Sequence, residues 1–345
     1  MIGLLRGAEG ESREAALEFW NRIPEVRACC DDPETFEKPF AAEAYAFVHL
    51  LERYRRMWSV LRYLCSTGAL PLAVRGVNVL DVGSGPGPSM LAVQEFYEAL
   101  HEYASFAGVR ELLVPSPRLN FVERSQTMRN FYSRFREFTG RYDAVGPGFS
   151  NFTGLDLKSI RAFHKRQNEV ESWWDPETGE DEEIYDPVGA AESASRLHRY
   201  RLVVLSNFLT LPTDVERWRE ELCALFKDLR PGAVVVVLGG SGGKYTGIYQ
   251  SATQIAKESR LREEDWASYE SASKPPSDDV ALLIKGSQHR VYLALEELAG
   301  ADSLSRDKAW PDYWNPVPSP DARYRFSLRI YRRDRWPKGR RKRSV

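Results

Sequence analysis

Residues 77–87 read Val-Asn-Val-Leu-Asp-Val-Gly-Ser-Gly-Pro-Gly, an apolar run that passes directly into a turn with glycine at every second position. The run predicts a buried strand, and glycine lets the turn adopt positive φ angles and lets the backbone approach a ligand closely. Residues 89–103 are predicted to form a helix, whose unpaired N–H groups and positive dipole end would face the same ligand. The sequence therefore predicts a cofactor site at this junction; the alternative is a tight turn that binds nothing.

The spacing of the glycines separates two classes of cofactor. Dinucleotide-binding folds use G-x-G-x-x-G, whereas this turn has G-x-G-x-G with an acid, Asp81, two residues before the first glycine. Strand, acid and three glycines in this order resemble motif I of the class I S-adenosylmethionine (SAM)-dependent methyltransferases. The resemblance implies that SAM is the cofactor, that the turn passes under its methionine part, and that Asp81 helps to hold its amino group. The implied contacts are Asp81, Gly83, Ser84, Gly85 and Gly87.

A second acid stands where the resembled family places the residue that binds the ribose of SAM. Glu123 ends the apolar run of residues 119–122, and residues 125–138 after it have helical spacing. A carboxylate suits two neighbouring hydroxyl groups because both of its oxygens accept hydrogen bonds. The resemblance implies that Glu123, with Arg124 beside it, contacts the cofactor, although the segment between Gly87 and Glu123 is longer than is usual in the family. The alternative is a solvated carboxylate at a strand end.

Alternating strands and helices along the rest of the chain predict the fold class. Residues 201–208 and 232–238 form apolar runs typical of strands covered on both faces, with a helix at 214–229 between them. A third core strand is expected within 144–155, and residues 324–331 alternate apolar and polar side chains as an edge strand does. We expect an α/β, Rossmann-like, doubly wound sheet. The resemblance implies seven strands, mostly parallel, with an antiparallel last strand.

Methyl transfer from a sulfonium is an in-line displacement, so a protein that catalyses it mainly aligns the acceptor and excludes water. The polar residues expected near the acceptor are Ser206, Asn207, Tyr245 and His289, and Ser206 would also border SAM. For His289 a surface position is the alternative. The resemblance further implies adenine-binding residues near the end of the third strand, for which the candidates are Asn151, Phe152 and Asp156.

Several other classes of site lack their motifs. The stretch Asn207-Phe208-Leu209-Thr210 has no pair of prolines, which disfavours an adenine-amino methyltransferase. The loop at 239–245 fails the P-loop pattern because Tyr245 stands at its final position. The four cysteines, at positions 29, 30, 65 and 223, have neither C-x-x-C spacing nor a nearby pair of histidines, so no metal site is expected.

Length and composition predict one enlarged domain with appendages. The chain has 345 residues, of which 43% are hydrophobic, enough for a large core. We divide it into an N-terminal helical extension or lid at 1–70, a SAM-binding core at 71–331 with an insertion around 141–200, and a basic tail at 332–345. The apolar stripe of the helix at 41–65 indicates either a lid or ordinary packing. No leader or membrane-spanning stretch is recognised, which predicts a cytoplasmic protein.

The end of the chain is strongly basic. Residues 331–345 hold eight basic side chains against one acidic one, whereas the whole chain has a formal net charge of −1. Such a tail can neutralise phosphates, so RNA is one expected partner; a solubilising tail, or one folded back on the acidic segment 173–186, is the alternative. Three functions remain: an active SAM-dependent methyltransferase, an inactive SAM-binding factor associated with RNA or ribosomes, and an NAD-dependent oxidoreductase, which the glycine spacing disfavours.

Overall fold

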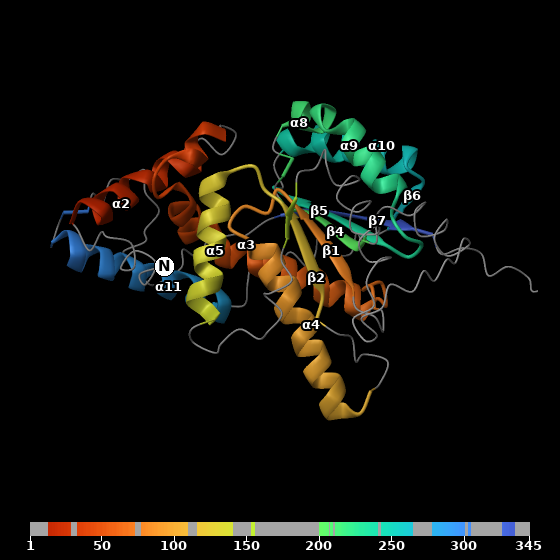
Figure 1. The fold of residues 1–345 in the computed structure, drawn as a ribbon, viewed down its shortest axis with the longest axis horizontal. Helices are drawn as coiled ribbons and strands as arrows, with labels where there is room; N and C mark the ends of the chain where they lie inside the picture. The colour runs from red at the N-terminus through yellow and green to blue at the C-terminus, as the bar shows by residue number, and fades with distance from the viewer. Residues whose placement is uncertain are drawn as a thin grey trace, which may run out of the picture.

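The computed structural model describes residues 13–28, 33–72, 77–109, 116–140, 153–155, 200–206, 208–209, 211–240, 243–264, 278–300, 303–304 and 326–334. Seven strands form one sheet in the order β3-β2-β1-β4-β5-β7-β6 (Figure 1). The first five in this order are parallel, and β7 runs antiparallel to both of its neighbours. The strands are β1 (Asn78–Val82), β2 (Arg118–Val122), β3 (Thr153–Leu155), β4 (Tyr200–Ser206), β5 (Val234–Gly239), β6 (Leu261–Glu263) and β7 (Ser327–Arg333).

This sheet confirms the predicted fold class, including the antiparallel last strand. β1 lies between β2 and β4, and its Val82 is level with Val122 on one side and Leu205 on the other. Ligands of such sheets bind beyond the carboxyl ends of the strands. Because the three strands end at the same level, Asp81, Glu123 and Ser206 reach the same edge of the sheet.

Helices cover both faces of the sheet, as the apolar runs of the central strands require. One face packs on the second half of α3 (Ala41–Ser66) and on α4 (Pro88–Ala107), with Val79 and Val204 among the buried contacts. The other face, with Leu80 and Val203, packs on α8 (Pro212–Arg217), α9 (Arg219–Lys227) and α10 (Thr246–Glu258) (Figure 1). A short 3₁₀ helix, η5 (Gly243–Tyr245), leads into α10.

A third apolar cluster lies beside the sheet and joins the two ends of the chain. It brings together α2 (Arg13–Ala28), the start of α3, α5 (Gln126–Gly140) and α11 (Asp278–Ala299). Trp20 of α2 and Tyr292 of α11 are fully buried against each other, with ring centroids 5.4 Å apart. The N-terminal helices therefore share their core with a helix from the far end of the sequence.

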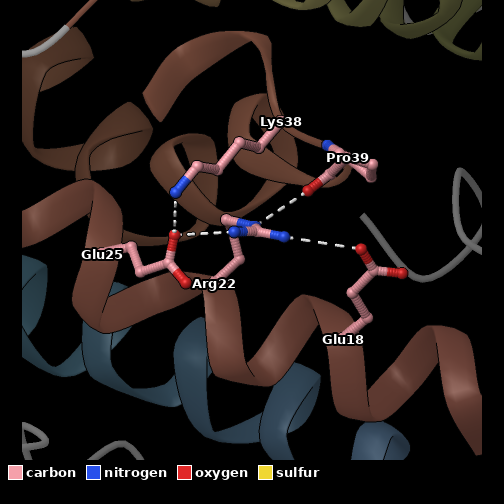
Figure 2. Close-up of polar contacts among 5 residues, drawn as sticks. All are labelled: Glu18, Arg22, Glu25, Lys38 and Pro39. Carbon is pink, nitrogen blue, oxygen red and sulfur yellow. Dashed lines mark hydrogen bonds and ion pairs between the residues drawn. The ribbon is translucent and has the colours of Figure 1, made fainter. Parts of the chain in front are cut away.

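A network of polar contacts attaches α2 to the turn before α3 (Figure 2). The Nε of Arg22 donates to the carbonyl oxygen of Pro39 at 3.1 Å, and its Nη1 donates to Oε2 of Glu25 at 2.6 Å. Lys38, next to the 3₁₀ helix η1 (Pro33–Glu37), donates to the same glutamate oxygen at 2.9 Å. Phe40 follows with a φ of 58°, a left-handed conformation that costs energy in any residue with a side chain. Arg22 thus holds a strained turn at the start of α3.

Two boundaries differ from the sequence prediction. The expected helix at 214–229 is two helices that meet at Trp218, and the first begins at Pro212 because Asp214 accepts a hydrogen bond from the N–H of Leu211 at 3.0 Å. β7 continues to Arg333, so the first two residues of the predicted basic tail belong to the sheet. The guanidinium of Arg333 donates to the carbonyl oxygens of Phe226 and Lys227 at the end of α9, which satisfies carbonyls that a helix end leaves unpaired.

Arg22→Met is expected to lower the free energy of unfolding by about 1–2 kcal/mol, because the substitution leaves the Pro39 carbonyl without its side-chain donor and leaves the Glu25 carboxylate with Lys38 alone. Lys38→Met removes the exposed member of the same network, whose side chain is 48% exposed, and should cost less than about 1 kcal/mol. Urea unfolding measures both variants. Equal losses would show that Arg22 contributes only surface charge.

Candidate functional site

The turn after β1 has the backbone conformation that its glycines predict. Gly83, Gly85 and Gly87 have φ angles of 71°, 55° and 85°, all in the left-handed region. The N–H of Gly83 donates to the carbonyl oxygen of Val122 at 2.8 Å, which joins the turn to the end of β2. Gly87 precedes Pro88, the first residue of α4, so the turn leads directly into a helix N-terminus. Positive φ at three alternate positions explains why the chain uses glycine there.

Side chains of the protein occupy the space beside two of these glycines. A Cβ on Gly83 would lie 2.5 Å from Cδ2 of Phe208, and one on Gly87 would lie 2.7 Å from the ring of Tyr132. At Gly85 the first contact would be Cε1 of Tyr45, at an ordinary 3.7 Å. The sequence interpretation, in which all three glycines make room for a ligand, is therefore too broad. The missing Cβ atoms at Gly83 and Gly87 make room for the protein's own aromatic rings. Only at Gly85 among the three does the missing Cβ leave room for a ligand to approach the backbone.

Asp81 is a buried carboxylate without a partner. Its side chain is 1% exposed, and neither of its oxygens has a hydrogen-bond partner among the described residues. Burial, and to a smaller extent the charge of Glu123, raises the pKa of Asp81 to about 8. Burying an acid without hydrogen bonds destabilises a fold and calls for a functional explanation.

Glu123 lies against the turn, as the sequence predicted. Its Oε2 accepts a hydrogen bond from the N–H of Gly85 at 2.6 Å, and its Oε1 accepts one from the N–H of Ser125 at 2.8 Å. Burial raises the pKa of Glu123, although these backbone N–H groups oppose the shift. Each carboxylate oxygen has a second lone pair, so Glu123 can still accept hydrogen bonds from a ligand.

The buried hydroxyls near the turn extend this polar site. Ser84 within the turn and Ser89 in the first turn of α4 are 5% and 1% exposed, and neither hydroxyl has a hydrogen-bond partner among the described residues. Ser84 was among the contacts that the resemblance implied, whereas Ser89 was not. Its position near a helix N-terminus preceded by three glycines was the signal that could have identified it.

The polar face of α3 also lies over the turn, and sequence reasoning did not identify it. Tyr45, His49 and Arg53 follow one another at four-residue spacing, so they share a helix face. The ring of Tyr45 lies over Gly85 and is 4.8 Å from the ring of His49, and Arg53 donates a hydrogen bond to Oη of Tyr45. Sequence analysis recorded only the apolar stripe on the same helix. The polar residues at matching spacing were the available signal.

The predicted acceptor residues are distributed over two regions. Ser206 ends β4 and is 5% exposed, level with Leu238 of β5. Tyr245 closes η5 and lies against Gly240, just after β5. His289 lies on α11, where it stacks on Tyr292 at 6.3 Å in the helical cluster beside the sheet. The structure thus places Ser206 and Tyr245 at the ends of adjacent strands and His289 on a helix that packs against α2.

The remaining predicted residues are exposed or lie outside the described ranges. Arg124 is exposed. Asn207, Asn151, Phe152 and Asp156 lie outside the residues that the structure describes. Within the described part of the chain, no three histidine, cysteine or acidic side chains come together as a metal site. None of the helices in that part combines the length and the apolar composition needed to cross a membrane.

Comparison with known proteins gives structural neighbours only. No family model and no curated protein matches the sequence. An O-methyltransferase family protein from Burkholderia thailandensis is 11% identical, with a TM-score of 0.37, and the match covers 94% of this chain and 71% of that one. A magnesium protoporphyrin IX methyltransferase from Synechocystis PCC 6803, solved with bound SAM, is 11% identical, with a TM-score of 0.35 over 62% and 71% of the two chains. Precorrin-6y C5,15-methyltransferase from Geobacter metallireducens GS-15 is 14% identical, with a TM-score of 0.31, and the match covers 61% of this chain and 72% of that one.

The sheet itself and its first turn assign the fold. Five parallel strands are followed by an antiparallel strand that pairs with β5, in agreement with the architecture that the resemblance implied. The acid and three glycines of motif I stand at the carboxyl end of β1, and a second acid stands at the end of β2. The chain has the fold of the class I S-adenosylmethionine-dependent methyltransferases.

Proposed function

We propose that this protein transfers a methyl group from SAM to an acceptor by in-line displacement. The observation that carries the proposal is the buried carboxylate of Asp81 beside the glycine turn, which has no hydrogen-bond partner among the residues that the structure describes. An ammonium group would neutralise that acid and give its oxygens hydrogen-bond donors. The α-amino group of SAM has this chemistry, and Glu123 stands close enough to the same turn to receive the ribose hydroxyls.

The residues of the site fit the parts of SAM in order along the edge of the sheet. Asp81 would hold the amino group, Gly85 would let the backbone lie against the methionine part, and Glu123 would accept from the ribose hydroxyls. When bound, SAM supplies a methyl group on a sulfonium, which leaves as a neutral thioether. The buried hydroxyls of Ser84 and Ser89 are further donors beside the turn.

Aromatic side chains line the edge next to the turn and would exclude water from the reacting groups. Phe208 follows β4 and lies against Gly83. Tyr249 lies against Gly239, the last residue of β5, and Tyr245 lies against Gly240, which follows it. The hydroxyl of Tyr249 donates to the carbonyl oxygen of Gly240 at 2.9 Å, which fixes that ring. This side of the site would align the acceptor with the methyl group, with Ser206 as the nearest polar side chain predicted from sequence.

Calorimetric titration with SAM and with NAD tests the choice of cofactor. We expect SAM to bind and NAD to give no heat, because the turn has methyltransferase spacing. Binding of NAD alone would favour the oxidoreductase instead.

Transfer of a labelled methyl group from SAM into a cell extract then separates an active enzyme from a SAM-binding factor that acts on RNA. A labelled product supports catalysis, and its size class identifies the kind of acceptor.

Asp81→Asn is expected to stabilise the protein and to weaken SAM binding. Because the pKa is raised from 3.8 to about 8, the folded protein holds a proton on Asp81 over this pH range that the unfolded chain has released. Stability therefore falls as the pH rises through the range. Asparagine does not ionise, so the stability of the Asn variant relative to the wild type should increase by up to about 1.4 kcal/mol for each pH unit of rise within this range.

Urea unfolding of both proteins on either side of neutral pH measures this difference, and calorimetry measures SAM affinity, which should fall at least about tenfold with the loss of a charged hydrogen bond. An Asn variant less stable than the wild type at alkaline pH would contradict the account of the buried acid. Unchanged SAM affinity would contradict its role in binding.

Gly85→Ala is expected to weaken SAM binding, whereas Gly108→Ala at the far end of α4 should leave it unchanged. Both glycines have left-handed φ angles, 55° and 68°, and nothing lies within 4 Å of a Cβ on Gly108. Backbone strain should therefore lower the free energy of unfolding by a similar amount in each variant, about 1–2 kcal/mol. Unfolding confirms that the two variants are matched, and calorimetry compares their affinities. Equal affinities would show that the cofactor does not contact Gly85.

A further inference from the structure

One face of α3 runs along the carboxyl edge of the sheet. At its start Tyr45 lies over Gly85, after β1. Near its middle Arg56 lies over the ring of Phe326, with 5.6 Å between the guanidinium carbon and the ring centroid. Phe326 directly precedes β7, whose first residue is level with Gly239 at the end of β5. This face of α3, which we call the α3 wall, therefore extends from the proposed cofactor turn to the acceptor side of the site.

The α3 wall carries one arginine, Arg53, that no carboxylate of the described residues neutralises, and a second, Arg56, whose only such partner is Glu52. Arg53 is half-buried; it donates to Oη of Tyr45, its guanidinium carbon lies 4.7 Å from that ring centroid, and no carboxylate among the described residues pairs with it. Arg56 forms an ion pair with Glu52 through its Nη2. Its side chain is only 14% exposed, and its buried Nε has no hydrogen-bond partner in the described chain. Unsatisfied guanidinium groups in such surroundings are costly unless an anion completes them.

The environment of His49 shows the same excess of charge. Burial lowers the pKa of His49 well below its usual value, and the charges of Arg53, Arg56 and Arg27 lower it further. All the charges that act on this imidazole are thus arginines. Because His49 stays neutral at physiological pH, it adds no further cation to the wall. Glu52 pairs with Arg56, whereas no carboxylate among the described residues pairs with Arg53.

We propose that Arg53 and Arg56 form a carboxylate-binding site on the α3 wall, between the glycine turn and the end of β5. The proposal rests on the proposed function, because it places this site beside the turn where the cofactor would bind. A guanidinium binds a carboxylate through two parallel hydrogen bonds, which suits the free donors of Arg53. The carboxylate comes either from the amino-acid end of SAM or from the acceptor.

Charge complementarity supports a carboxylate rather than an uncharged ligand. Among the described residues, Asp81 beside the turn has no hydrogen-bond partner, and Arg53, a cation that contacts Tyr45 above the same turn, has no acidic partner. An amino acid carries both opposite charges and would complete both groups. A cavity of about 480 Å³ lies between Glu43 of α3 and Arg134 of α5, but those two residues already pair with each other. It therefore offers an anion no comparable attraction.

The first experiment separates the two sources of the carboxylate. Calorimetry measures the binding of SAM and of decarboxylated SAM, which keeps the ammonium and the sulfonium, to the wild type, Arg53→Met and Arg56→Met. If the cofactor supplies the carboxylate, Arg53→Met should weaken SAM about 10- to 100-fold, as the loss of a charged hydrogen bond does, and leave decarboxylated SAM within about twofold. Arg53→Lys should restore part of the affinity.

If the acceptor supplies the carboxylate, SAM affinity should not change. Protein saturated with S-adenosylhomocysteine should then bind benzoate more tightly than uncharged benzamide, and Arg53→Met or Arg56→Met should abolish that preference. Arg62→Met is the matched control, because Arg62 is an exposed arginine on the same helix, and it should leave both measurements unchanged. Circular dichroism and thermal unfolding confirm that each variant folds.

The proposal is overturned if folded Arg53→Met and Arg56→Met proteins keep the wild-type preference for SAM over decarboxylated SAM and also keep the wild-type response to benzoate. It is likewise overturned if Arg62→Met has the same effect as Arg53→Met, since the arginines would then act only through net charge. Failure of the wild type to bind SAM at all would instead reject the proposed function, and the benzoate titration without cofactor would still test the arginines.

Discussion

The burial of Asp81 at the end of β1 is the constraint on which the rest of the site depends. A carboxylate that is 1% exposed and has no hydrogen-bond partner in the described chain lowers the stability of the fold. The structure increases this cost by placing Glu123 at the end of the neighbouring strand, where its charge raises the pKa of Asp81 further. A fold tolerates such a pair when a ligand of opposite charge completes it, and acids with raised pKa values are concentrated at functional sites.

Parallel pairing and the glycine turn together bring these acids to one place. β1 and β2 pair in register, and the N–H groups of Gly83 and Gly85 bond to the backbone and side chain at the end of β2. Aromatic rings pack against this turn, Phe208 at Gly83 and Tyr132 at Gly87. Gly83 and Gly87 therefore serve internal packing, which leaves Gly85 as the glycine open to a ligand.

The N-terminal helices link this site to distant parts of the chain. α2 holds the strained turn at Phe40 through Arg22, and the two helices share an apolar cluster with α11. The position of α3 sets where Tyr45 lies over the glycine turn, and His49 and Arg53 contact Tyr45 from the same helix face. One helix thus packs on the sheet through its apolar stripe and presents part of its polar face to the turn.

The sequence alone determined the central strands, the glycine turn and the two acids, because buried parallel strands read as continuous apolar runs and a left-handed turn requires glycine. It did not indicate β6, which has three residues and no periodic signal, or the break at Trp218, where local geometry divides a pattern that looks continuous. Only the tertiary structure decided that Phe208 and Tyr132 fill the space beside two glycines, that the helix of His289 packs beside α2, and that Arg53, which contacts Tyr45, has no acidic partner among the described residues. Those facts depend on contacts between segments that lie tens to hundreds of residues apart in the sequence. The spacing of residues along the chain predicts local structure but does not predict which distant side chains will be in contact.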